Sequence, residues 1–559
     1  MMVLTRSSSP RRSLLAAVPL AAVSLALAGA LGGHGALAAG LSFATPVSLQ
    51  GGCGGEPSID LDGKGDVYVS APKGIINFAG SCQGIAASMQ GAATWVSNDG
   101  GSTFGPMISA GTLIGGGDTD TTVDRATGDV YVTDLEAVAA DVCVSTDKGQ
   151  TYSTVFTGAE SCTTPFNFTG QAGPSNDREW LTVYGPTATY AHKDVYLTYH
   201  DFATNLPEIW ISQDGGPFTP SLFPGVSNPA FAASALNGTL IAKPVLDKDG
   251  NIYQLVATPS MQNGSLDQLW SVISTDHGQN FTATLIFDGS SAGANLGLVF
   301  NDLAIDGAGN LYALVLGNAA GATPPDNVYL WISTDKGATW KQHQVPTDGK
   351  AVVLPALHGG ALAGQLVFGF YHSTNTTDTN DLTGQWKYTA FESSNADTAT
   401  PTYTSIDLGS ASNPGTGIVH QGQICTAGID CTTGQVVGPA GSGNRNLADF
   451  SSVVIDQNGC AIFTYADDGK ILPDQSNFDF SLINNDVSRQ TSGCFATAAA
   501  TTTATPTATP SPTAAQLPAS ASATPNTSAA SPGGAAGAAG LAAILATAGL
   551  ARARRRRRR

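Results

Sequence analysis

A turn motif that recurs along the chain constrains the fold more than any other feature of the sequence. Four segments share the spacing Ser-x-Asp-x-Gly-x-Thr/Asn-aromatic: Ser97 to Phe104, Ser145 to Tyr152, Ser274 to Phe281 and Ser333 to Trp340. A shortened copy runs from Ser212 to Phe218. The copies return at steps of roughly 50 to 65 residues, which is typical of a repeat architecture. Such a repeat indicates small units that bury their apolar faces only by stacking on their neighbours.

Each repeat predicts a small antiparallel sheet. In the first repeat, an alternating strand at 57–61 ends in a Gly/Asp turn, and a return strand follows at 66–69. A third strand at 94–96 then enters the Ser-x-Asp turn. In that turn the Ser and Asp side chains can accept hydrogen bonds from backbone amides, and Gly supplies a positive φ.

The repeated turn resembles the Asp box, or BNR repeat, of the sialidase-like β-propellers. The resemblance implies an all-β propeller over residues 39–495, in which the Asp box itself has a structural role. Counting strand pairs predicts seven blades, near 57–105, 119–155, 175–222, 240–285, 300–345, 354–408 and 445–490. Six blades, the number in the enzymatic sialidases, is the alternative. An N-terminal strand at 41–49 is expected to complete the last blade and close the ring.

The two ends of the chain differ from the predicted propeller. Residues 1–38 combine three arginines, an apolar run and an Ala-x-Ala pattern, which is typical of a signal peptide. Residues 496–534 are rich in Thr, Pro, Ser and Ala and predict a disordered stalk. Residues 535–559 are apolar and end in seven arginines, a stop-transfer pattern. We therefore expect a monomer exported to the cell surface and held at the membrane by its C-terminus, although the tail also resembles a processed sorting signal.

The charge of the chain excludes one class of partner, and its cysteine content predicts disulfides. All 43 acidic residues lie in 39–495, but only 15 of the 25 basic ones do, since three are in the leader and seven in the tail, which leaves a net charge of −28. A nucleic-acid partner requires the opposite field, so that class is excluded. Eight cysteines in an exported domain predict disulfides. Because short loops close most readily, the expected pairs are Cys53 with Cys82, Cys143 with Cys162, Cys425 with Cys431, and Cys460 with Cys494.

Polar residues next to the predicted innermost strands are the candidate site residues. These strands start near the propeller axis, so the residues before them are expected to converge on one axial mouth. They are Glu56, Asp118, Asp120, Asp177, Arg178, Glu179, Lys243, Asn301, Asp302, Arg445 and Asp449, with His200, Asp201, Tyr371 and His372 at strand ends.

We assign three kinds of role within this set. The candidate catalytic residues are Asp177, Arg178, Glu179 and Asp201, and the candidate substrate-binding residues are Glu56, Asp120, His200, Asp302, Tyr371, Arg445 and Asp449. Asp118 and Asp120 could hold Ca²⁺ through hard oxygen ligands. No cofactor is required.

The wider chain resembles secreted proteins that are commonly labelled exo-α-sialidases. The segments that carry the resemblance are Gly117 to Asp120, Asp177 to Trp180, Tyr199 to Asp201, Asn444 to Phe450, Tyr465 to Asp468, and Arg489-Gln-Thr. If the chain is an enzyme, the resemblance implies a glycoside hydrolase in which three arginines bind the substrate carboxylate. The domain has only four arginines, Arg125, Arg178, Arg445 and Arg489, and it lacks the Arg-Ile-Pro motif of the enzymes. Such a triad would require Arg178, Arg445 and Arg489 to converge.

Two functions remain open at this point. The first is a surface propeller that recognises glycans at the axial mouth, with or without hydrolysis. The second is a non-catalytic scaffold or adhesion propeller that binds proteins or wall polymers. The first predicts that Arg178→Ala abolishes glycan binding and leaves thermal unfolding nearly unchanged.

Overall fold

A computed structural model describes most of the expected propeller domain. The described residues are 40–49, 55–73, 91–110, 117–136, 139–152, 176–201, 206–221, 228–260, 265–297, 300–321, 326–426, 444, 446–469 and 483–497. The expected signal peptide, the stalk from residue 498 onward and the anchor segment lie outside them, as does Arg445. None of the helices in the described ranges is long and apolar enough to cross a membrane.

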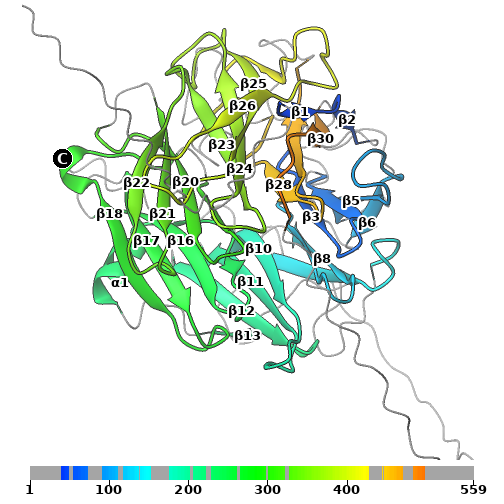
Figure 1. Cartoon of the computed structure of the whole chain (residues 1–559). Coiled ribbons are helices and arrows are strands. Elements are labelled where there is room, and N and C mark those ends of the chain that lie inside the picture. The colour runs from blue at the N-terminus through cyan, green and yellow to red at the C-terminus, as the bar shows by residue number, and fades with distance from the viewer. Residues whose placement is uncertain are drawn as a thin grey trace, which may run out of the picture. The chain divides into compact units, whose positions relative to one another are not determined.

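The described residues form an all-β, seven-bladed propeller made of seven antiparallel sheets (Figure 1). Blade 1 consists of β3 (Ser58–Leu61), β4 (Val67–Ala71), β5 (Ala92–Ser97) and β6 (Ile108–Ala110). Blade 2 consists of β7 (Thr121–Val123), β8 (Val130–Glu136) and β9 (Ala139–Ser145). Blade 3 consists of β10 (Asn176–Tyr184), β11 (Asp194–Asp201), β12 (Leu206–Gln213) and β13 (Thr219–Pro220).

The next two blades follow the same order from the axis outward. Blade 4 consists of β14 (Leu240–Ile241), β15 (Val245–Leu246), β16 (Ile252–Pro259), β17 (Leu266–Ser274) and β18 (Thr282–Asp288), preceded by helix α1 (Pro229–Ala235) and followed by the 3₁₀ turn η2 (Ser290–Ala292). Blade 5 consists of β19 (Asp302–Ile305), β20 (Leu311–Gly317), β21 (Asn327–Ser333) and β22 (Lys341–Val345).

The last two blades complete the ring. Blade 6 consists of β23 (Val352–Gly359), β24 (Leu366–Ser373), β25 (Gln385–Ser393), β26 (Thr404–Asp407) and β27 (His420–Gln421). Blade 7 consists of β28 (Ser452–Ile455), β29 (Ala461–Asp467) and β30 (Asn484–Ser492), together with β1 (Ser42–Phe43) and β2 (Val47–Ser48). The prediction of seven blades is therefore confirmed, and the alternative of six is wrong.

The ring is closed by strands from both ends of the domain. The innermost strands contact one another in the order β3, β7, β10, β15, β19, β23, β28 and back to β3. The N-terminal strands β1 and β2 pair antiparallel with β30, so that Ser42 lies opposite Ser492 and Val47 opposite Val487. Figure 1 shows the orange strands of blade 7 beside the blue strands of blade 1. The expected closure by residues 41–49 is thus confirmed.

The repeated turn has one geometry in its four full copies. In each copy the Ser hydroxyl accepts a hydrogen bond from the Gly amide at 2.7–2.8 Å and donates one to the Asp carboxylate at 2.7–2.8 Å. The same carboxylate accepts a bond from the Thr or Asn amide at 2.8–2.9 Å. The shortened copy departs from this pattern, since Ser212 donates to the Gly216 carbonyl instead. In the four full copies, the second oxygen of the carboxylate accepts from the Thr hydroxyl or the Asn side-chain amide at 2.5–2.8 Å, so both oxygens of the Asp are engaged within the turn.

The repeated turn also locks each blade to the one before it. Lys148, at φ 62° in the turn of blade 2, lies with its Nζ 2.5 Å from a carboxylate oxygen of Asp66 in blade 1. A Cβ at the next residue, Gly149, would lie only 2.8 Å from Val96 of blade 1. Lys336 makes the corresponding ion pairs from blade 5 to Asp247 and Asp249 of blade 4. Gly is therefore needed for close packing between blades as well as for its positive φ.

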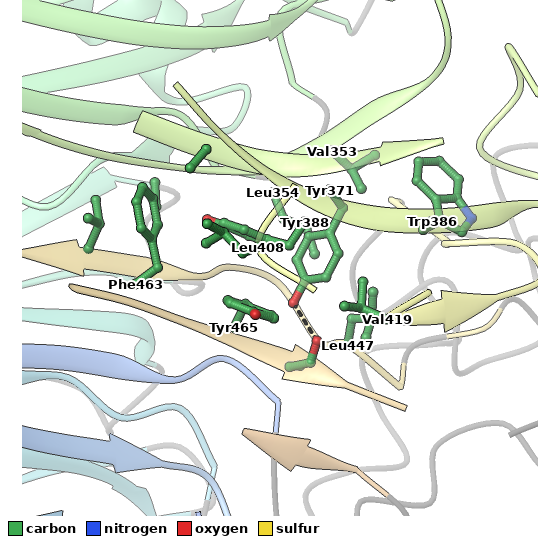
Figure 2. Packing of buried hydrophobic residues seen from close by; sticks show 14 of the residues in the cluster. Val353, Leu354, Tyr371, Trp386, Tyr388, Leu408, Val419, Leu447, Phe463 and Tyr465 are labelled. Atoms are coloured by element: carbon green, nitrogen blue, oxygen red, sulfur yellow. Dashed lines mark hydrogen bonds between the residues drawn. The ribbon is translucent and has the colours of Figure 1, made fainter. Parts of the chain in front are cut away.

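The apolar core is divided into clusters that lie largely between neighbouring blades. In the cluster of blades 6 and 7, the ring of Tyr388 stacks on that of Tyr465 with centroids 4.5 Å apart (Figure 2). The Tyr388 hydroxyl is hydrogen-bonded to Ser451 at 2.7 Å. Burial of both sheet faces explains why second strands such as β20 and β24 read as nearly continuous apolar runs.

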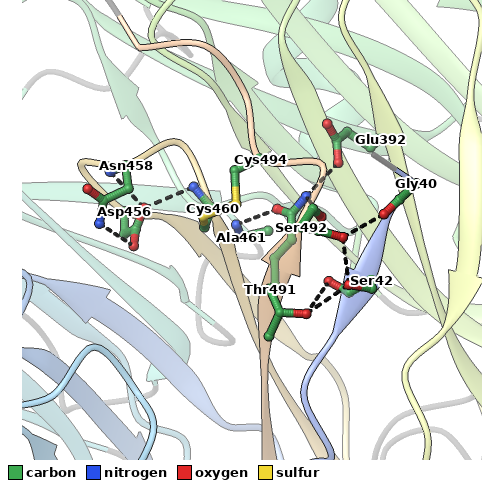
Figure 3. Close-up of a disulfide and its surroundings, with 11 residues drawn as sticks. Gly40, Ser42, Glu392, Asp456, Asn458, Cys460, Ala461, Thr491, Ser492 and Cys494 are labelled. Atoms are coloured by element: carbon green, nitrogen blue, oxygen red, sulfur yellow. Dashed lines mark hydrogen bonds between the residues drawn. A yellow bond between two sulfur atoms is a disulfide. The ribbon is translucent and has the colours of Figure 1, made fainter. Parts of the chain in front are cut away.

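One predicted disulfide lies wholly within the described residues. Cys460, just before β29, is bonded to Cys494, just after β30 (Figure 3). Cys143 and Cys425 are also disulfide-bonded. The other four cysteines lie outside the described residues, so the remaining pairings stay predictions.

Candidate functional site

A channel of about 520 Å³ lies at the propeller axis. Every blade contributes its innermost strand to the wall, through residues that include Ile59, Val123, Val183, Val245, Leu303, Leu357 and Val453. Because the seven strands are held at a fixed distance by the packed blades, the ring itself creates this space. Pockets of this size are typical small-ligand sites.

The two ends of the channel differ. At the end where the inner strands finish, which we call the open end, the wall is formed by exposed residues such as Arg125, Pro186 and Thr187. At the end where the inner strands begin, which we call the closed end, the wall contains the rings of Trp180, Phe300 and Phe450. Trp180 and Phe450 are buried, with ring centroids 5.1 Å apart.

Four of the predicted axial residues, Asp120, Lys243, Asn301 and Asp302, line the channel at this closed end. Asp120 is fully buried, Asn301 is 5% exposed, and the Lys243 side chain is 28% exposed. The sequence placed these residues at an open mouth, whereas the described residues place them at the buried end, because the aromatic rings beside them fill the axis.

Three axial carboxylates link neighbouring inner strands. Each accepts a hydrogen bond, at 2.7–2.8 Å, from a backbone amide of another innermost strand. The pairs are Asp60 with Val123, Asp120 with Leu181, and Asp302 with Leu357. These acids therefore hold the blades in register around the axis, and part of their hydrogen-bonding capacity is committed to the fold.

Lys243 provides a cation at the closed end of the channel. Its Nζ lies 2.8 Å from Oδ2 and 2.9 Å from Oδ1 of Asp120, and it donates to the Thr121 carbonyl at 3.0 Å. Burial raises the pKa of the nearby Asp302 to about 7, although Lys243 and two backbone amides act in the opposite direction. Lys243 therefore offsets the charge of Asp120, and Asp302 is only partly ionised near neutral pH.

Arg178 occupies a buried position beside the channel rather than in its wall. Its guanidinium carbon lies 3.6 Å from the ring centroid of Trp180 and 3.7 Å from that of Phe450. Both terminal nitrogens donate to the Thr119 carbonyl, at 3.3 and 3.4 Å. A β-bulge between Asp177 and Trp180, with φ 50° at Arg178, allows this side chain to turn between the rings. Arg178 is 1% exposed, so its charge is used in cation–π packing and is not available to a ligand.

Glu179 is fully buried on the same strand. Neither of its carboxylate oxygens finds a hydrogen-bond partner in the part of the chain that the structure describes. Burial, and then the nearby Asp118 charge, raise the pKa of Glu179 well above its ordinary value. Burial therefore favours the protonated form of this side chain, which lies outside the channel wall.

The other predicted site residues are spread over several places. Asp177 and His200 face each other across β10 and β11, and Asp201 ends β11. Tyr371 is buried between blades 6 and 7, where it donates to the Ala466 carbonyl at 3.0 Å. His372 contacts Asp348 at 2.8 Å. None of these lines the channel.

Two further predicted residues, Glu56 and Asp449, are also absent from the channel wall. Glu56 is buried and has φ 47°, and Asp449 is half-buried next to Phe450. For the predicted calcium site, no group of three or more acidic, His or Cys side chains that could hold a metal occurs among the described residues. Asp118 accepts from the Arg178 amide, and Asp120 contacts Lys243.

The arginines do not form a carboxylate-binding triad within the described residues. Arg178 is buried at the closed end, while Arg489 lies on β30, two strands outward from the innermost strand of its blade. Arg125 is half exposed at the open end, 3.6 Å from Asp60. Arg445 lies outside the described residues. A clamp made of Arg178, Arg445 and Arg489 is therefore not available, because two of its members are directed elsewhere.

The aromatic residues at the closed end were not among the predicted site residues. Trp180 follows Glu179, Phe300 precedes Asn301, and Phe450 follows Asp449. These three residues could have been predicted from their neighbours in the sequence, because each lies next to a polar residue of the predicted site. An aromatic residue in that position, near the start of an inner strand, places its ring at the axis.

Comparisons with known proteins are limited to structural likeness. No family model and no curated protein matches the chain. A protein of unknown function from Dyadobacter fermentans is 13% identical, covers 80% of this chain and 99% of its own, and has a TM-score of 0.41. The Hadza microbial sialidase Hz136 is 13% identical, covers 78% of this chain and 65% of its own, at a TM-score of 0.37.

A third solved structure is the NanB sialidase of Streptococcus pneumoniae. It is 13% identical, covers 80% of this chain and 70% of its own, and has a TM-score of 0.36. Likeness at this level carries no information about activity, so the function has to be argued from the geometry of the channel.

Proposed function

We propose that this protein is a surface-displayed propeller that recognises glycans in its axial channel and does not hydrolyse them by the sialidase route. The observation that carries the proposal is the channel itself, an axial space of about 520 Å³ with one exposed end and one buried end. A space of that size suits one or two sugar rings entering from the open end.

The composition of the wall supports a carbohydrate ligand. The half-buried ring of Phe300, beside the buried rings of Trp180 and Phe450, offers an apolar surface against which the C–H face of a sugar can pack. Lys243, Asn301 and Asp302 add polar groups between them. Sugars present both apolar faces and hydroxyl groups, so a wall that combines these two features is favourable for them.

The placement of the ionisable groups argues against sialidase-type hydrolysis. That chemistry needs an arginine cluster for the substrate carboxylate and an accessible acid. Here the Arg178 guanidinium is enclosed by two rings, Arg489 lies on an outer strand, and Glu179 is fully buried. Recognition requires none of these groups to be free.

A pair of bulky substitutions tests the proposal. Thr182 lines the channel, so Thr182→Trp should obstruct it, whereas Thr219→Trp places the same ring on the exposed strand β13. The full-length chain and both variants would be applied to a glycan array, with thermal unfolding recorded for each. We expect glycan binding by the wild type and by Thr219→Trp, and loss of binding for Thr182→Trp.

Two outcomes would overturn the proposal. One is the absence of binding to any glycan by the folded wild type. The other is unchanged binding by a folded Thr182→Trp. If that variant unfolds, Ala126→Trp replaces it, since Ala126 lines the same channel at its exposed end.

A non-catalytic scaffold remains the second candidate function. It is favoured by the commitment of Asp60, Asp120 and Asp302 to neighbouring backbone amides, which indicates that many axial polar groups serve the fold. A scaffold would bind proteins or wall polymers through its outer surfaces. Such binding would survive Thr182→Trp and would be weakened by substitutions on exposed outer strands.

A further inference from the structure

His358 presents a hydrogen-bond acceptor at the open end of the channel. It is the next-to-last residue of β23, it lines the channel, and it is half-buried. Its Nδ1 lies 2.8 Å from the carbonyl oxygen of Gly359. Because a carbonyl oxygen can only accept, Nδ1 carries a proton and is the donor in this hydrogen bond. The bond therefore fixes the orientation of the imidazole at the end of the strand.

The other ring nitrogen of His358, Nε2, is available to a ligand. It has no hydrogen-bond partner among the described residues, and it is not one of the enclosed polar atoms that lack a partner. Burial, and then the positive charge of Arg125, lower the pKa of His358 to about 4, although Asp60 and the Gly359 carbonyl act in the opposite direction. The imidazole is therefore neutral near pH 7, and Nε2 carries a lone pair that accepts a hydrogen bond.

Arg125 supplies the complementary donor at the same end of the channel. Its side chain is 52% exposed and lines the channel from the turn between β7 and β8. Its one ion pair within the described residues, with Asp60, has a distance of 3.6 Å, which is longer than a hydrogen bond. Guanidinium N–H groups therefore remain available to a ligand. The effect of Arg125 on the pKa of His358 indicates that the two side chains lie close to each other.

An acceptor beside a donor matches two neighbouring hydroxyl groups of a sugar. A hydroxyl group both donates and accepts, so one hydroxyl can donate to Nε2 of His358 while its neighbour accepts from Arg125. A carboxylate or sulfate group would satisfy Arg125 alone, because the neutral Nε2 requires a donor. Both side chains reach solvent in the ligand-free channel, so a ligand that enters from the open end contacts them directly.

We infer that His358 and Arg125 together bind two adjacent hydroxyl groups of a sugar ring at the open end of the channel. His358 accepts from one hydroxyl through Nε2, and Arg125 donates to the other. The ligand class is therefore a glycan with a ring that carries two neighbouring free hydroxyl groups. This inference rests on the proposed function, because it names the residues with which the same channel selects its ligand.

Variants of the two residues test the inference on the full-length chain. His358→Leu removes the acceptor, His358→Gln restores one through its amide oxygen, and Arg125→Met removes the donor. His343→Leu, on the outer strand β22, is the control. Isothermal titration calorimetry near pH 7 would measure binding of cellotriose, maltotriose, mannotriose and a galacturonic acid trimer, with thermal unfolding recorded for each variant.

The expected result is a matched loss of affinity in the two deletion variants. For each neutral trisaccharide that the wild type binds, the dissociation constant should rise about tenfold in His358→Leu and in Arg125→Met, which corresponds to roughly one hydrogen bond. His358→Gln should recover part of the loss, and His343→Leu should bind like the wild type. If His358→Leu does not fold, Arg125→Met and His358→Gln carry the test, since the Arg125 side chain is exposed.

Diethyl pyrocarbonate gives a second readout, because it acylates neutral and accessible imidazole nitrogens. Peptide mass spectrometry should find His358 modified in the ligand-free protein and protected by a saturating trisaccharide that binds.

The possible results lead to different conclusions. Unchanged affinity in folded His358→Leu, or a His358 that is unreactive or is not protected by a bound trisaccharide, would overturn this inference and leave glycan recognition standing. Binding of the galacturonic acid trimer that depends on Arg125 and not on His358 would also overturn it, because Arg125 would then bind a carboxylate. A wild type that binds no saccharide on the array would remove the proposed function as well.

Discussion

The imidazole Nδ1 of His420 lies 2.7 Å from the Asp468 carboxylate, and both side chains are 1% exposed. The other ring nitrogen, Nε2, lies 3.0 Å from the Gln423 carbonyl oxygen. Since both partners are acceptors, both ring nitrogens act as donors, and His420 is a buried imidazolium. Asn446 donates to the second oxygen of Asp468 at 2.9 Å, so the pair ties the segment around β27 to the end of β29.

We predict that this ion pair makes stability depend on pH. Burial disfavours the charged imidazolium, but Asp468 and the Gln423 carbonyl more than offset it and raise the His420 pKa above its ordinary value. A raised folded-state pKa means that the stabilisation is complete below the unfolded-state pKa, about 6.5, and is lost as pH rises through the folded-state value. Thermal unfolding should therefore show wild type losing its advantage over His420→Gln on the alkaline side of neutrality.

The stability of the His420→Gln variant measures how much the ion pair between His420 and Asp468 contributes to folding. Because His420→Gln leaves Asp468 buried without its cation, we expect a loss of about 3 kcal/mol at pH 6. The exposed pair of His192 and Asp214 is the control, and His192→Gln should cost less than 1 kcal/mol. A difference between wild type and His420→Gln that stays constant from pH 5 to pH 9 would show that His420 does not titrate with folding.

Arg178→Ala should destabilise the propeller strongly. The substitution leaves a cavity between Trp180 and Phe450 and removes two cation–π contacts and the bonds to the Thr119 carbonyl. We expect a loss of about 3–5 kcal/mol. Arg125→Ala, at the exposed end of the same channel, should change stability by less than about 0.5 kcal/mol. Denaturant titration measures both, and equal small effects would mean that the guanidinium is not packed between the rings.

Arg178 also shows where sequence reasoning was limited. The sequence predicted that this arginine would bind a ligand and be dispensable for stability, because it lies just before an inner strand, where side chains approach the axis. That placement holds for Asp120, Lys243, Asn301 and Asp302. The direction of a side chain depends on the bulge at Arg178 and on the rings that flank it, and neither is encoded in the spacing of polar residues.

The number and the positions of the blades could be predicted from the sequence for a physical reason. Each repeated turn marks the same point in a blade, so the spacing of the turns reports the period of the ring. Blade 6 lacks the turn, and counting strand pairs still located it near 354–408, where β24 and β25 lie. The channel could not be predicted in the same way, since its two different ends depend on how residues from all seven blades fill one axis.

Gly149→Ala should separate two reasons for glycine in the repeated turn. Gly149 has φ 73°, and an added Cβ would lie 2.8 Å from Val96 of the preceding blade. Gly100 has a similar φ of 69° but open space around it. We expect Gly100→Ala to cost about 1 kcal/mol through its backbone alone, and Gly149→Ala to cost a further 1–3 kcal/mol through the clash. Equal losses in urea unfolding would mean that the turn does not lock the blades together.

The disulfide between Cys460 and Cys494 should stabilise the closure of the ring. Cys494 follows β30, the strand that also pairs with β1 and β2, so the bond fixes the end of this strand to the start of β29. The two cysteines are 34 residues apart, and constraining a loop of that length in the unfolded chain contributes at most about 4 kcal/mol. The double variant Cys460→Ala/Cys494→Ala should lose stability of that order in denaturant titration. Proteolysis should then begin at β30 and at the N-terminal strands paired with it, before the other blades are cut. Retention of full stability, or first cleavage within blades 2 to 5, would show that the ring does not depend on this bond for its closure.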